Sequence, residues 1–224
     1  MKKVVLLFVM ALSILPIYAR SSRAPSQEQL QAMTAEEKNR YFPIPYQKVT
    51  SSHETAILGY IQKYQAAKST LAPADILDNA NRVAKYWDID IDYLICIMRK
   101  ESSFCQRATK AEVIYGHNYL SYGVCQIIGY DRTGKHPYGA LDVYLFHGGD
   151  GVYKWSDITN FSEPNMYIAC FYLRFLWKNH SNLVTVDKLL GAYNAGPSGC
   201  DKPAAVRYAA TVQNYVTELK SLYK

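Results

Sequence analysis

The sequence predicts a mainly α globular domain with long irregular loops and at most a small hairpin. Six segments after residue 50 place apolar residues at the spacing of a helix with one buried face. No segment alternates polar and apolar residues over a confident strand length. The 224 residues are 49% hydrophobic and 20% charged, which is typical of a folded chain with a core of its own.

Residues 1–19 have the features of a cleaved secretory signal. Two lysines precede the apolar stretch 4–15, and Ile17-Tyr18-Ala19 offers a small-residue cleavage site. The apolar stretch is shorter than the ~20 residues that a membrane span needs, so cleavage is favoured over a retained anchor. We therefore expect an exported protein of the periplasm or cell envelope, with no stable membrane anchor after cleavage.

Residues 20–50 form a polar segment that we expect to be a poorly packed lead-in or linker. Capping-box patterns begin at Ser26 and Thr34, and each is compatible with a short helix or with a linker. The domain itself is expected to cover residues 51–224.

Three helices are expected in the first half of this domain. The first begins at the capping-box pattern of residues 51–54. Pro73 helps to open the second, because proline is favoured in the first turn of a helix. The third covers residues 92–101, with Asp90 as the candidate N-cap.

Residues 105–161 interrupt the helical pattern with many Gly, Tyr, Asp and His residues and little periodicity. Loops, short helices or a small hairpin all fit this stretch, and long irregular segments within a domain are often functional. Three more helices are expected afterwards, starting near Ser162, covering residues 186–195, and starting near Pro203. In the last of them Tyr208 and Tyr215 share the predicted inward face.

Composition restricts the cofactors and partners. Removal of residues 1–19 would take away two lysines and no acid, so the formal net charge would fall from +6 to +4. This mildly basic charge suits an anionic surface such as a cell wall or membrane, and solubility alone explains it nearly as well. No Lys/Arg block indicates nucleic-acid binding. No C-x-x-C or H-E-x-x-H spacing indicates a metal, so neither a metal nor another cofactor is expected.

The chain has five cysteines, and export would permit disulfides between them. An odd number leaves at least one thiol unpaired within the chain, and the sequence does not give the pairing. They are Cys96, Cys105, Cys125, Cys170 and Cys200.

Glu101 occupies a position where the helical pattern calls for an apolar residue. Leu94, Ile97 and Met98 fall at i, i+3 and i+4 of one stripe, and Glu101 follows at i+7. Desolvation disfavours an ionised carboxylate, so the pKa of Glu101 should rise. A raised pKa suits a general acid near neutral pH. A buried glutamate neutralised by a basic partner explains the position about as well.

Three motifs occur in order from Glu101 onward: Glu101-Ser102-Ser103-Phe104, Gly123-Val124-Cys125-Gln126, and Ala192-Tyr193-Asn194-Ala195-Gly196. Together they resemble the motifs E-S-x-F, G-L-M-Q and A-Y-N-A-G of the soluble lytic transglycosylases, a family with a lysozyme-like fold. Weaker resemblances at residues 165–173 and 213–216 extend the match to nearly the whole domain. The chain departs from the family pattern at Cys125, at Ala169 and in the longer segments 105–120 and 128–161.

The resemblance implies cleavage of the β-1,4 bond between N-acetylmuramic acid and N-acetylglucosamine in peptidoglycan glycan strands. Glu101 would act first as general acid and then as base, giving a 1,6-anhydro product. The resemblance also implies substrate-binding roles for Ser102, Gly123, Gln126, Tyr193, Asn194 and Tyr215. Core packing of Tyr193 and helix capping by Ser102 or Asn194 are the structural alternatives.

Two other functions fit the same motifs. A hydrolase of the lysozyme type would use a second carboxylate, for which Glu112 and Asp131 are candidates, although neither lies in a motif and each is more typical of a solvated loop charge. A non-catalytic peptidoglycan-binding structural subunit is the third interpretation. Because no wall-binding repeat is evident, the sequence slightly favours an enzyme associated with secretion, conjugation or pilus machinery over one for general wall turnover.

Overall fold

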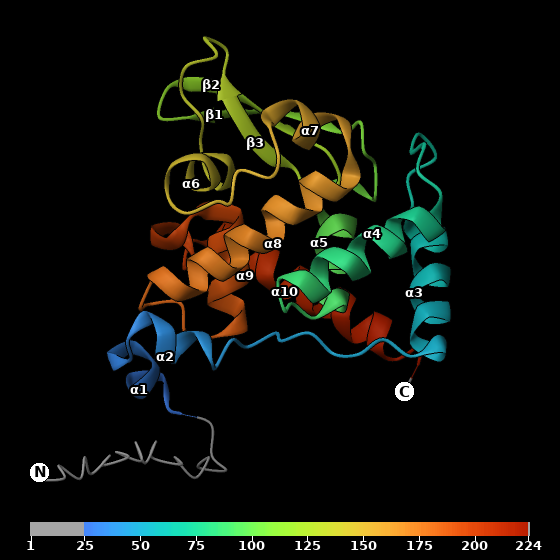
Figure 1. The fold of residues 1–224 in the computed structure, drawn as a ribbon, viewed down its shortest axis with the longest axis horizontal. Coiled ribbons are helices and arrows are strands. Elements are labelled where there is room, and N and C mark those ends of the chain that lie inside the picture. Colours follow the sequence, from blue (N-terminus) through green and yellow to red (C-terminus); the bar gives the residue numbers. More distant parts are fainter. Residues whose placement is uncertain (1–24, 224) are drawn as a thin grey trace, which may run out of the picture.

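Helix α5 (Ile91–Ser102) lies at the centre of a helical body (Figure 1). A computed structural model describes residues 25–223 of the chain. Asp90 caps α5 by accepting a hydrogen bond from the Asp92 N–H at 3.0 Å. Helices α3 (Ser51–Tyr64), α4 (Pro73–Tyr86) and α10 (Pro203–Lys220) pack around α5. Leu94, Ile97 and Met98 are fully buried, as their spacing predicts.

Two further helices complete the body. Helix α8 (Ser162–Asn179) packs against α4, and α9 (Val186–Ala195) packs against both α8 and α10. A short 3-10 helix, η1 (Pro197–Gly199), follows α9, which ends at Ala195 as expected. The predicted mainly α architecture is therefore confirmed, and the six expected helices begin at or within one residue of the positions predicted for them.

The segment before α3 is packed against this body, so the expectation of a poorly packed lead-in is wrong for residues 25–50. Both capping boxes form and open helices α1 (Gln27–Ala32) and α2 (Ala35–Asn39). Trp177 Nε1 donates a hydrogen bond to the Lys38 carbonyl at 2.8 Å, and the Asp90 N–H donates to Ile44 at 2.7 Å. Phe42 and Ile44 are buried in the core. Pro43 and Pro45 lie in the part after α2 that forms no helix, so the buried residues there show no helical periodicity in the sequence.

A three-stranded antiparallel sheet covers one end of the body (Figure 1). Strands β1 (Thr109–Ile114), β2 (His117–Tyr122) and β3 (Ile127–Asp131) pair in chain order. Tyr115 and Gly116 join the first two strands with φ angles of 51° and 80°, the two positive values that a type I′ hairpin turn requires. The sheet thus has one strand more than the small hairpin expected. Much of β1 is exposed and polar, so its strand character comes from pairing rather than from a buried face.

Two short helices, α6 (Ala140–Phe146) and α7 (Trp155–Asn160), occupy the rest of the irregular stretch. All five cysteines are buried and free, so no disulfide contributes to the part of the chain that the structure describes. Between residues 25 and 223, no helix has both the length and the apolar character needed to cross a membrane. The predicted secretory signal, residues 1–19, lies outside the described residues.

Candidate active site

Glu101 lies in the last turn of α5, where the helix ends toward the sheet. Ser103 closes the helix in the left-handed conformation, with φ of 50°, and Phe104 follows with φ of 61°. The side chain of Glu101 is partly exposed, although the stripe that leads to it is fully buried. The carboxyl is therefore surrounded by protein on most sides without being sealed from solvent.

Desolvation raises the pKa of Glu101 from its usual value to about 7. A hydrogen-bonding interaction with the Tyr208 hydroxyl and the charges of Lys110 and Lys100 oppose the rise, while the charge of Glu112 adds to it. Neither lysine forms a salt bridge with Glu101, and no other basic side chain within residues 25–223 does so, so a neutralising ion pair does not explain the position of the carboxyl. Such a carboxyl can donate and recover a proton near neutral pH.

Tyr208, on α10, is the tyrosine that lies beside Glu101, and the sequence analysis did not assign it to the site. Desolvation raises the pKa of its phenol well above the usual value, and the charge of Glu101 adds to this. The buried hydroxyl forms no well-aligned hydrogen bond with any group among residues 25–223, Glu101 included, although it lies close enough to that carboxyl for each to influence the pKa of the other. Tyr208 is thus positioned to hydrogen-bond the carboxyl or a bound molecule after a small adjustment.

Tyr215, two turns farther along α10, was expected to bind substrate but packs against Arg99 instead. The centre of its ring lies 3.6 Å from the Arg99 guanidinium carbon, and the Tyr64 ring lies 3.3 Å away from the same carbon. Arg99 also forms an ion pair with Glu218 at 2.7 Å. Tyr208 and Tyr215 share one helical face, so sequence spacing alone could not tell which turn meets Glu101.

Gly123 was expected to allow close approach of a substrate, but the group that approaches it is a side chain of this protein. Asn165 on α8 accepts a hydrogen bond from the Cys125 N–H at 2.8 Å and donates to the Tyr122 carbonyl at 2.9 Å. A Cβ atom at Gly123 would lie 2.5 Å from Asn165 Nδ2. The glycine therefore lets α8 hold the loop that follows β2.

Gly123→Ala should lower the free energy of unfolding by roughly 2 kcal/mol, because the residue has φ of +80° and its new methyl would displace Asn165. Urea denaturation of the parent and variant would measure the change. Gly116→Ala is a matched control, since its φ is also +80° but no atom lies within 4 Å of the added Cβ. An equal loss in both variants would show that backbone strain, rather than the contact with Asn165, accounts for the effect.

Ser102 and Gln126 hold the same loop against the end of α5. Ser102 Oγ donates to the Val124 carbonyl at 2.8 Å and accepts from the Cys105 N–H at 3.1 Å. Gln126 Nε2 donates to the carbonyls of Ala108 at 3.1 Å and Gly123 at 3.0 Å. Both side chains are thus positioning groups whose donors are already used, which departs from the substrate-binding roles expected for them.

Tyr193 and Asn194 lie at the end of α9 with different surroundings. Tyr193 donates a hydrogen bond to the Cys125 carbonyl at 2.9 Å, which supplies the partner that an inward-facing hydroxyl requires. Its ring stacks with that of Tyr208 at a centroid distance of 6.4 Å. Asn194 is exposed, so its amide remains open to a bound molecule. Tyr193 therefore links the loop after β2 to the tyrosine beside Glu101.

The two candidate second carboxylates differ in their availability. The Thr133 hydroxyl and two backbone N–H groups donate to Asp131 and lower its pKa to about 2, so this carboxylate stabilises a turn. Glu112, on β1, is close enough to Glu101 to raise the pKa of that carboxyl. It pairs with Lys110 at 2.7 Å on the partly exposed surface of the sheet. Glu112 is therefore the stronger candidate of the two.

No group of three or more His, Cys, Asp or Glu side chains within residues 25–223 is arranged to hold a metal ion. Comparison of the chain with protein-family models, with curated proteins and with solved structures finds no match.

Proposed function

We propose that this protein is an exported peptidoglycan lytic transglycosylase. The observation that carries the proposal is the raised pKa of Glu101, about 7, at the end of a helix beside Tyr208, where the charges of Lys110 and Glu112 on β1 also act on the carboxyl. The resemblance of the three motifs supports the substrate class. A carboxyl that is about half protonated at neutral pH suits both halves of an acid–base cycle.

The proposed reaction uses Glu101 twice. Protonated Glu101 first donates to the oxygen that bridges N-acetylmuramic acid and N-acetylglucosamine, and the acetamido oxygen of the substrate stabilises the positive charge that develops at C1. The ionised carboxylate then removes the proton from the 6-hydroxyl of the muramyl sugar. That oxygen closes on C1 to form the 1,6-anhydro ring, and no water is consumed.

A hydrolase of the lysozyme type is the second candidate, because Glu112 is close enough to influence the Glu101 carboxyl. In that reaction Glu112 would stabilise the cation or activate water, and the product would carry a reducing end. Its salt bridge with Lys110 argues against this role, since a paired carboxylate is less available to a cation.

Digestion of purified wall sacculi followed by mass spectrometry of the products tests the proposal. Lytic transglycosylation predicts muropeptides that are lighter by one water than the hydrolytic ones. Products of the heavier mass would replace the proposal with the hydrolase. Binding to sacculi without release of any product would favour the non-catalytic structural subunit.

Tyr193→Phe should slow this turnover less severely than loss of Glu101, because it frees the loop after β2 without removing the acid. It should also lower the free energy of unfolding by about 1 kcal/mol, since the Cys125 carbonyl loses its hydrogen-bond donor. Product release and thermal unfolding measure the two effects. An unchanged rate with reduced stability would assign Tyr193 to the core alone.

Export and a partner machine are part of the same proposal. The pattern of residues 1–19 supports export to the periplasm or cell envelope, and the lack of an evident wall-binding repeat favours association with envelope-spanning secretion or conjugation machinery. Fractionation of cells that express the full chain tests export. A protein of full length in the cytoplasm would contradict it.

A further inference from the structure

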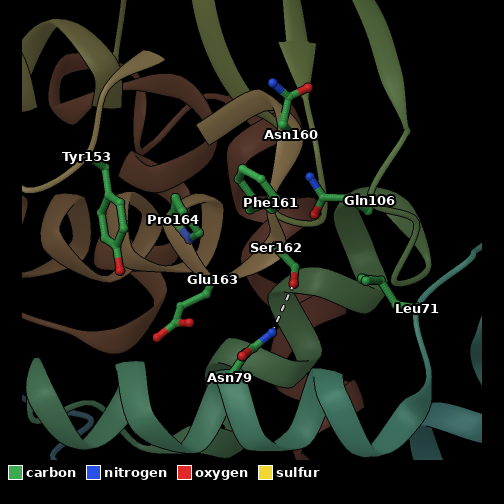
Figure 2. A pocket seen from close by; sticks show the side chains of 9 residues that line it. All are labelled: Leu71, Asn79, Gln106, Tyr153, Asn160, Phe161, Ser162, Glu163 and Pro164. Atoms are coloured by element: carbon green, nitrogen blue, oxygen red, sulfur yellow. Dashed lines mark hydrogen bonds between the residues drawn. The ribbon is translucent and has the colours of Figure 1, made fainter. Parts of the chain in front are cut away.

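A cavity of about 350 Å³ lies between α4 and the start of α8, and Glu101 is not among the residues that line it (Figure 2). Asn79 donates a hydrogen bond to Ser162 Oγ at 3.1 Å, and in the view Tyr153 and Gln106 lie on opposite sides of this pair. An adjoining cavity of about 270 Å³ shares Tyr153 and Glu163 and also contacts Tyr86. Together they form a groove whose volume is within the range of small-molecule sites.

Gln106 supplies a buried acceptor that no group of the described chain satisfies. The residue is only 7% exposed. Its Nε2 donates weakly to the Thr159 carbonyl at 3.4 Å, whereas Oε1 is buried without a hydrogen-bond partner among residues 25–223. Buried polar atoms are nearly always paired, so an orphaned acceptor in a cavity wall indicates a ligand that brings a hydroxyl or N–H donor.

The rest of the lining indicates a neutral ligand with flat apolar faces. The two charged side chains nearby neutralise each other, since Arg82 and Glu163 form an ion pair at 3.1 Å. Phe161 is 60% exposed and lines the first cavity, and Tyr153 lines both cavities. One exposed and one partly buried ring beside amide and hydroxyl groups provide an apolar surface and hydrogen-bonding groups for one ligand.

We propose that this groove binds a sugar residue of a glycan, apart from the site at Glu101. A pyranose ring presents hydroxyl and acetamido N–H donors at its rim and C–H groups on its faces, which matches the orphaned acceptor and the two rings. A peptide fits less well, because no strand edge lines either cavity to pair with its main chain. The inference extends the proposed function to a second glycan contact, but its test does not depend on cleavage.

The test is an NMR titration of the protein and its variants with the β-1,4-linked trimer of N-acetylglucosamine. Glu101→Gln serves as the starting protein, so that the trimer is not consumed. We expect the side-chain amide signals of Gln106 and Asn160 to shift. Phe161→Ala, added to Glu101→Gln, should weaken binding of the trimer by about tenfold, as measured from these two signals. This factor corresponds to about 1.4 kcal/mol.

Phe146→Ala is the matched control, because Phe146 is 66% exposed and lies on α6, outside both cavities. It should leave the affinity unchanged. The proposal would be overturned if saturating trimer left the Gln106 signal in place, or if both variants bound equally well. It would also be overturned if a wall stem peptide, but not the trimer, shifted that signal. A shift without cleavage of sacculi by the parent would reject the proposed enzyme while supporting the groove.

Discussion

Glu101→Gln should reduce release of anhydro-muropeptides from sacculi by at least about a hundredfold. The amide has nearly the shape of the carboxyl but cannot give a proton to the leaving oxygen, and general acid–base catalysis typically contributes factors of 10²–10⁴. Because one group acts in both steps of the proposed cycle, loss of that group removes both. Single-time-point product analysis at pH 6, where most of the carboxyl is protonated, would measure the loss.

Glu112→Gln is the matched control for this loss, since it makes the same chemical change at the neighbouring carboxylate. It should retain most of the activity, with a small change caused by the lower pKa of Glu101 when the nearby negative charge is gone. Equal losses in the two variants would show that both carboxylates act in the reaction, as in the hydrolase. Near-parental activity of Glu101→Gln would remove Glu101 from the mechanism.

Glu101→Gln should also make the protein more stable at pH 8, by up to about 3 kcal/mol. The pKa of Glu101 is about 7 in the folded protein, whereas an ordinary glutamate, as in the unfolded chain, has a pKa of 4.5. Each pKa unit corresponds to 1.36 kcal/mol. The partial exposure of the side chain makes this figure an upper bound. An active-site group held in an unfavourable environment for the sake of activity often has such a cost.

The pH dependence has a definite sign. Between pH 4.5 and 7 the folded protein retains a proton that the unfolded chain has lost, so Glu101 makes the parent less stable as the pH rises through this interval. The stability of Glu101→Gln does not fall in this way, because glutamine does not ionise. Urea denaturation should therefore give equal stabilities at pH 4 and a difference that grows up to about pH 8. A difference that is the same at both pH values would show that packing, not ionisation, separates the two proteins.

Sequence patterns predicted the helices well because their signals are local. Pro73 opens α4 as predicted, Asp90 caps α5, and Gly196 ends α9. At α3 the pattern located the start correctly, but the capping side chain is that of Thr50, which accepts from the His53 N–H at 3.3 Å. Each of these features depends on residues within one or two turns.

The sheet and the first segment of the chain depend instead on distant partners. Strand β1 has no buried side chain, so burial does not impose an alternating sequence on it, and its conformation is fixed by pairing with β2. Phe42 contacts Trp177, a residue far along the chain, and no local pattern reveals that contact. Such tertiary contacts override local preference.

The candidate site shows the same division. The position of Glu101 on a buried stripe predicted the environment that raises its pKa. The sequence could not predict that Asn165 fills the space beside Gly123, because the two residues come together only when α8 packs on the loop after β2. Nor could it assign Tyr208 in place of Tyr215, since both lie on the inward side of α10.

The carboxyl titration of Glu101 tests the central claim most directly. Carbon-13 NMR of protein with labelled glutamate side chains, with the signal assigned by its absence in Glu101→Gln, would follow this carboxyl from pH 3 to pH 9. We predict a midpoint of about 7. A midpoint near 4.5, the value of an ordinary glutamate, would contradict the claim that this protein holds a proton at Glu101 near neutral pH.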